Sequence, residues 1–140
     1  SPMDYREEMA NFAVTTITFD PTLFWYITVG TGALSGGSMA SEIAEVACTV
    51  FTMDTDNIIL KAVITEYDIA KKGGMSQFST GNADLKVLTE IGVWTRVTVG
   101  GARTLKEAST MGPTGTLKCQ LIDVMRNGKI IINYRISNGP

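Results

Sequence analysis

The feature that most constrains the fold is the dipeptide Asn127-Gly128, which lies between two runs of alternating apolar and polar residues near the C-terminus. Asn-Gly favours a type I′ turn, because both central residues of that turn need positive φ. The sequence therefore predicts a β-hairpin with strands over residues 118–126 and 129–137. The facing residues, which share one side of the ribbon, are Met125 with Ile130, Asp123 with Ile132, Leu121 with Tyr134, and Cys119 with Ile136.

Seven of these eight side chains are apolar or aromatic, so this side of the hairpin is predicted to face a core. Asp123 is the exception, and a carboxylate buried there would need hydrogen-bond partners. The opposite side is mostly polar and cationic, but it contains Ile122, Val124 and Ile131. Three clustered apolar side chains outside a core indicate a surface that another element or a second copy covers, so they are candidate interface residues.

The rest of the chain also has strand-like segments separated by turn residues. They are Phe12–Phe19, Leu23–Val29, Glu45–Met53, Ile58–Tyr67 and Val93–Val99. Short helical turns are predicted near residues 39–45, with a strand as the alternative over 39–52, and over Thr104–Met111. Without βαβα alternation, this pattern predicts a mainly β domain over residues 12–140, an antiparallel β-sandwich or barrel that is jelly-roll-like. Residues 1–11 are predicted to be a mobile segment, in which Ser-Pro before Met3 resembles a tag remnant.

Composition limits the chemistry that this chain can support. Hydrophobic residues make up 44% of the 140 residues, which is enough for one core and for a buried subunit contact, but no apolar run is long enough to span a membrane. Histidine is absent, which removes the commonest general base and metal ligand. The spacing of Cys48 and Cys119 does not match a metal site. A single disulfide between them is one alternative. Two buried thiols in a reducing compartment, such as the cytoplasm or a virion, are favoured. We therefore expect no enzyme, no metal and no cofactor.

Three other motifs are weak. The Gly30–Ser38 loop follows an apolar strand, as a phosphate-binding loop would, but it lacks the lysine of a P-loop. Residues 54–57 (Asp-Thr-Asp-Asn) offer oxygen ligands for calcium, but the glycine and glutamate of an EF-hand are missing. Glu66, Asp68 and Asp20 could act in glycoside hydrolysis if a cleft held two of them at the required separation. The alternative interpretations are a surface loop for the glycine-rich segment, a hairpin tip for residues 54–57, and solvated strand ends for the carboxylates.

Positive charge is concentrated late in the chain. Residues 1–90 contain 12 acidic and 5 basic side chains, whereas residues 91–140 contain 2 acidic and 7 basic ones. Trp94 and Arg96 share one side of a predicted strand, and an exposed aromatic ring among cations can stack on a base or a sugar ring. The candidate ligand-binding residues are therefore Trp94, Arg96, Arg126, Lys129 and Arg135. The alternatives are a tryptophan packed under a loop, and acidic and basic halves that pair within the fold or between copies.

Together these features favour a non-catalytic structural or assembly protein that self-associates as a homo-oligomer, such as a virus-encoded component of a particle. The alternative is a binding module for single-stranded nucleic acid or glycan that uses the Trp/Arg face. A small enzyme that uses the glycine-rich loop or the carboxylates is the third hypothesis. The last fifty residues have the general pattern of a jelly-roll tail, which carbohydrate-binding modules and viral coat proteins share too widely for it to assign a function.

Overall fold

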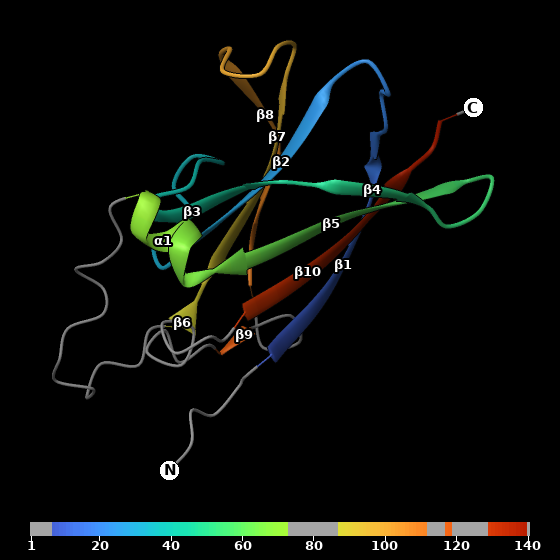
Figure 1. The fold of residues 1–140 in the computed structure, drawn as a ribbon. Helices are drawn as coiled ribbons and strands as arrows, with labels where there is room; N and C mark the ends of the chain where they lie inside the picture. Colours follow the sequence, from blue (N-terminus) through green and yellow to red (C-terminus); the bar gives the residue numbers. More distant parts are fainter. Residues whose placement is uncertain (1–6, 73–86, 112–116, 119–128, 140) are drawn as a thin grey trace, which may run out of the picture.

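The computed structural model describes residues 7–72, 87–111, 117–118 and 129–139, and these residues are mainly β-structure (Figure 1). In chain order the elements are β1 (Glu7–Thr18), β2 (Phe24–Gly30), β3 (Glu42–Ala47), β4 (Thr49–Thr52), β5 (Asn57–Thr65), α1 (Glu66–Lys71), β6 (Val87–Leu88), β7 (Glu90–Arg96), β8 (Arg103–Thr110), β9 (Leu117–Lys118) and β10 (Lys129–Ser137). Within the described ranges the six-residue helix α1 is far too short to cross a bilayer.

Two four-stranded sheets form a sandwich that is not closed into a barrel (Figure 1). Sheet A has the strand order β1-β10-β5-β4, and sheet B has the order β3-β2-β7-β8. The chain passes from sheet B to sheet A at Cys48, which alone separates β3 from β4. Of the predicted antiparallel β-sandwich or barrel, the sandwich is confirmed, with one exception to the antiparallel pairing: β1 and β10 pair in parallel.

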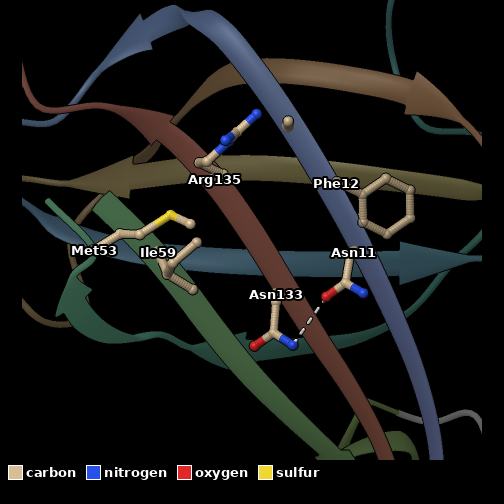
Figure 2. Close-up of a pocket in the computed structure, with 7 residues that line it drawn as sticks. Asn11, Phe12, Met53, Ile59, Asn133 and Arg135 are labelled. Atoms are coloured by element: carbon tan, nitrogen blue, oxygen red, sulfur yellow. Dashed lines mark hydrogen bonds between the residues drawn. The ribbon is translucent and has the colours of Figure 1, made fainter. Parts of the chain in front are cut away.

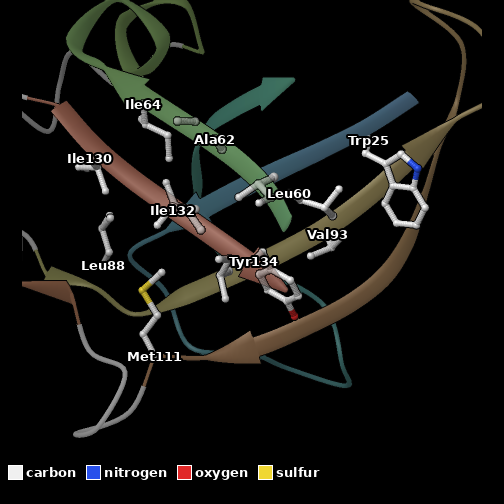
Figure 3. Close-up of a cluster of buried hydrophobic side chains, with 14 of the residues drawn as sticks. Trp25, Leu60, Ala62, Ile64, Leu88, Val93, Met111, Ile130, Ile132 and Tyr134 are labelled. Atoms are coloured by element: carbon white, nitrogen blue, oxygen red, sulfur yellow. The ribbon is translucent and has the colours of Figure 1, made fainter. Parts of the chain in front are cut away.

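The core lies between the two sheets, and β10 contributes its centre. Ile130, Ile132, Tyr134 and Ile136 are each at most 1% exposed, which confirms the inward side predicted for the second strand of the terminal hairpin. They pack with buried residues of β5 and of sheet B, including Leu60, Ala62, Ile64, Trp25 and Val93 (Figure 3). The first strand of that hairpin and its turn fall within residues 119–128, outside the described residues, and so does Asp123.

Two predicted helical turns are wrong. Residues 39–45 contain no helix, because β3 begins at Glu42 and pairs with β2. Residues 103–110 form β8, whose backbone pairs with β7. Tertiary strand pairing therefore overrides the local helical pattern in both segments.

Two boundaries also differ from the predictions. β1 begins at Glu7, so residues 7–11 belong to a strand that pairs with β10 rather than to a mobile N-terminal segment. The strand predicted over Ile58–Tyr67 ends at Thr65, and α1 begins at Glu66. The backbone N–H and the hydroxyl of Thr65 donate to Asp68 Oδ2 at 2.8 and 3.0 Å, half of a capping box that starts the helix.

Candidate functional site

The candidate ligand-binding residues lie on two different sheets. Trp94 and Arg96 are on β7 in sheet B and point away from the core, since their neighbours Val93 and Thr95 are at most 4% exposed. This confirms the predicted alternation, although β7 ends at Arg96 and not at residue 99. The other members of the set do not join them: Lys129 and Arg135 are on β10 in sheet A, and Arg126 lies outside the described residues.

The tryptophan ring already has a cation of its own chain against it. The Arg103 guanidinium carbon lies 3.7 Å from the centroid of the Trp94 ring, and the indole Nε1 donates to Thr28 Oγ1 at 2.7 Å. Arg96 lies over the Tyr26 ring in the same way, at 4.4 Å. Both arginines therefore stack on aromatic rings within sheet B, where a base or a sugar ring would have to displace them.

These arginines also form an ion-pair cluster with the acidic strand β3. Arg103 binds Glu42 through two hydrogen bonds, of 2.6 and 2.9 Å, and Glu45 through a third of 2.7 Å. Arg96 Nη2 lies 3.0 Å from Glu45 Oε1, and Lys72 Nζ lies 3.3 Å from Glu42 Oε2. The acidic and basic halves of the chain thus pair here within the fold. Because β3 and β8 are the two outer strands of sheet B, the cluster ties the sheet together across its full width.

The ion pairs change the proton affinity of Glu42. Burial raises the pKa of its carboxyl group, but the hydrogen bonds and positive charges of Arg103 and Lys72 outweigh burial, so the pKa is lower than the ordinary value. The carboxylate consequently stays ionised at neutral pH, as a structural ion pair requires.

The glycine-rich loop encloses a carboxylate rather than a phosphate site. Glu90 on β7 is fully buried, and its oxygens accept hydrogen bonds from the backbone N–H groups of Gly32 (3.0 Å), Ala40 (2.8 Å) and Ser41 (2.7 Å). Gly30 must lack a side chain, because a Cβ there would lie 2.3 Å from Glu90 Oε2 and 2.4 Å from the Ser41 carbonyl oxygen.

This arrangement argues against nucleotide binding at the loop. The N–H group of Gly32 in the loop, and those of Ala40 and Ser41 just after it, already bind the Glu90 carboxylate. The negative charge of this carboxylate would repel a phosphate brought to the same groups. The sequence signal for this site was an isolated acidic residue, Glu90, within the apolar run Val87–Val93. Such a residue is a candidate for a buried group with several hydrogen-bond partners.

The other carboxylates have local structural roles. Asp20 accepts hydrogen bonds from the backbone N–H and the hydroxyl of Thr22, which lower its pKa. Asp54 closes the β4–β5 turn by accepting from the backbone of Asp56 and from Asn57, and its pKa is lowered by the same bonds. Asp68 caps α1, and the side chain of Glu66 lies outside the described part of the chain. Among the residues that are described, no cluster of three potential metal ligands occurs.

A depression of about 320 Å³ lies on the outer face of sheet A (Figure 2). Arg135 and Asn133 of β10 lie between Asn11 of β1 and Ile59 of β5, and Met53 forms one end. Asn133 Nδ2 donates to Asn11 Oδ1 at 3.1 Å. Of the residues proposed from the sequence that the structure describes, Arg135 alone lines this depression. Asn11 and Asn133 had no sequence signal beyond their polar type.

The candidate interface residues are only partly described. Ile131 is 5% exposed although it does not belong to the core between the sheets, whereas Ile122 and Val124 lie outside the described residues. Its cross-strand neighbours are Met9 of β1 and Val63 of β5. Ile131 is therefore already covered in the single chain and offers little surface to a partner.

The β4 edge of sheet A, one of its two edges, is apolar instead. All four residues of β4 are exposed, and Val50, Phe51 and the following Met53 are 39%, 48% and 56% exposed. Their sequence signal, a β-branched and aromatic run next to a turn, had predicted a strand but not its place at an edge.

Cys48, at the crossing between the sheets, is a free thiol with its pKa raised to about 12 by burial. A thiol that stays protonated at neutral pH is a poor nucleophile. Cys119 lies outside the described residues.

Comparison with known proteins gives this chain no relatives. No protein-family model matches the sequence, no curated protein is significantly similar to it, and no solved structure matches the fold at a significant level.

Proposed function

We propose that the protein is a non-catalytic β-sandwich that self-associates, and that the β4 edge of sheet A joins one copy to another. The supporting observation is β4, an edge strand whose four residues are all exposed and which carries Val50 and Phe51 but no charged residue. Edge strands of this composition pair readily with other strands, because their outward N–H and C=O groups lack backbone partners and no lysine or proline hinders approach.

The pairing with β5 determines which backbone groups of β4 face outward. The Met53 N–H donates to the Asn57 carbonyl at 3.0 Å, and Phe51 lies opposite Ile59. In an antiparallel ladder, every second residue of a strand directs its N–H and C=O groups to the same neighbouring strand. Phe51 and Met53 therefore bond toward β5, and Val50 and Thr52 direct their N–H and C=O groups toward the open side.

A second copy fits this edge in one symmetric register. A two-fold axis at Phe51 places Val50 of each copy opposite Thr52 of the other, where the two residues can exchange both backbone hydrogen bonds. Phe51 then lies opposite its own counterpart, and Thr49 lies opposite Met53. No like charges are brought together, because residues 49–53 are uncharged and Asp54 would face Cys48 of the other copy.

The contact should be weak by itself. A four-residue edge gives few hydrogen bonds, and small interfaces belong to transient contacts. Such a contact becomes effective when further surfaces hold many copies together, as in an assembly. A place in a virus particle remains a prediction that no observation on this chain addresses.

The alternative function, ligand binding through Trp94 and Arg96, has less support, because Arg103 already lies on the Trp94 ring and Glu45 already forms an ion pair with Arg96. Binding of a glycan keeps one supporting observation, the depression that contains Arg135.

Sedimentation of the wild type and of Phe51→Lys between about 5 and 500 µM tests self-association. We expect the mean mass of the wild type to rise with concentration and that of Phe51→Lys to stay at the monomer value. Phe24→Lys is the matched control, since Phe24 is 45% exposed but lies on sheet B. A wild type that is monomeric throughout would refute self-association.

The register has its own test. In a background without Cys48 and Cys119, Phe51→Cys should form a disulfide between copies, because directly opposite residues on a non-hydrogen-bonded site are close enough to be bridged. Val50→Cys should not, since it faces Thr52. If Phe51→Lys abolishes association but Phe51→Cys does not cross-link, the edge is correct and the register is wrong.

A further inference from the structure

Arg135 differs from the other two arginines that the structure describes. Arg96 and Arg103 each have an aromatic ring and at least one glutamate as partners. The Arg135 side chain has no ion pair and no hydrogen bond with any described residue. Arg135 acts on the Asp54 carboxylate through its charge, and the Asp54 oxygens accept their hydrogen bonds from Asp56 and Asn57. The guanidinium therefore retains its hydrogen-bonding capacity.

The surroundings of Arg135 combine polar and apolar groups. The bond between Asn133 and Asn11 leaves the Asn133 carbonyl oxygen as an acceptor and the Asn11 amide nitrogen as a donor. Ile59 and Met53 form an apolar side of the same depression (Figure 2). Its volume, about 320 Å³, is at the small end of ligand sites and suits a molecule of the size of one sugar ring.

We propose that this depression binds a small carboxylate-bearing ligand of the acidic-sugar class. The guanidinium of Arg135 matches the two oxygens of a carboxylate in a bidentate geometry. The free amide groups of Asn11 and Asn133 match sugar hydroxyls, which both donate and accept. The C–H face of a pyranose ring would lie on Ile59 and Met53.

The same chemistry disfavours a nucleic acid at this place. Bases bind single-strand sites by stacking on exposed aromatic rings along a cationic groove. Among the described residues that line the depression, Phe12 is the only aromatic one and Arg135 the only cation. The Phe12 ring stacks on Tyr134, with ring centroids 5.8 Å apart.

The test is a titration of the whole chain, labelled with ¹⁵N, with glucuronate, glucose and acetate at equal ionic strength. We expect glucuronate to shift the amide signals of Asn11, Asn133 and Arg135 and to bind more tightly than acetate, which lacks the sugar ring and its hydroxyls. It should also bind about tenfold more tightly than glucose, because one charged hydrogen-bond pair is worth about that factor. Arg135→Met should lose this preference. Lys61→Met should keep this preference, because Lys61 is a cation of the neighbouring strand β5 that does not line the depression.

Three results would overturn the proposal: equal affinity for glucuronate and acetate, unchanged glucuronate binding by Arg135→Met, or stronger binding of a short oligothymidylate at the same residues. The titration is repeated with Phe51→Lys. Because the depression is formed within one chain, binding should persist in that variant, so a failure of self-association and a failure of ligand binding are read separately.

Discussion

Replacing Glu90 by glutamine should destabilise the protein by about 3 kcal/mol. The carboxylate is fully buried and accepts three backbone N–H groups, two at Oε2 and one at Oε1. Glutamine has one acceptor atom. If the glutamine oxygen keeps the hydrogen bonds from the N–H groups of Gly32 and Ser41, the glutamine NH₂ group faces the N–H group of Ala40. Both of these groups are donors, so no hydrogen bond forms between them.

The magnitude follows from the bonds affected. A hydrogen bond to a charged group contributes about 1.5–3 kcal/mol, and an unsatisfied buried donor costs about 1–3 kcal/mol. The lower cost of burying a neutral amide offsets part of this loss. Since a domain of this kind is stable by about 5–15 kcal/mol, the effect is large.

Urea unfolding, followed by the fluorescence of Trp25 and Trp94, measures this loss of stability. We expect the midpoint to fall by about 1–2 M for Glu90→Gln. Glu107→Gln is the matched control, because Glu107 is a half-buried strand carboxylate with one long hydrogen bond, 3.4 Å from Ser109 Oγ. Equal midpoints for the two variants, with unchanged hydrogen exchange at the loop amides, would show that the carboxylate does not stabilise the loop.

Three further predictions concern the rest of the fold. Gly92→Ala should lower the melting temperature by several degrees, because its Cβ would lie 2.7 Å from Thr28 Oγ1 and 2.9 Å from Trp94 Nε1; an unchanged melting temperature would contradict the close packing. Arg103→Lys keeps the charge but loses the bidentate and stacking geometry, so we expect a loss of about 1–2 kcal/mol in urea unfolding and a red shift of Trp94 emission, and wild-type values would argue against the cluster. Burial raises the pKa of Cys48 and, together with the charge of Glu107, that of Tyr134, each to about 12. The unfolded chain releases these protons first, so stability should be intact below about pH 9 and should fall as the pH rises toward 12, less steeply in Tyr134→Phe; equal urea midpoints at pH 8 and 11 would refute this.

The strands that could be predicted are those with a strong local pattern. Alternation in β10 and β7 correctly separated Ile130, Ile132 and Tyr134 from the outward-facing side chains, because side-chain direction in a strand depends only on sequence position. Segments 39–45 and 103–110 have no such pattern, and their neighbours in sheet B decide that they are strands.

The candidate sites were less accessible from the sequence. Trp94 and Arg96 were placed correctly on one face, but Arg103 and Glu45, which engage them, come from other strands. The same holds for the depression, which brings Asn11 and Asn133 together across 122 positions.

The sequence by itself determined that this chain is a mainly β domain, where several of its strands run, and which side of each strand is apolar. These properties arise from the period of two along a single strand. The tertiary structure alone decided the parallel pairing of β1 with β10, the burial of Glu90 within the glycine-rich loop, and the position of β4 at an open edge. Each of these depends on segments that are distant in the sequence, and the order of strands in a sheet is set by how the whole core packs rather than by any local pattern.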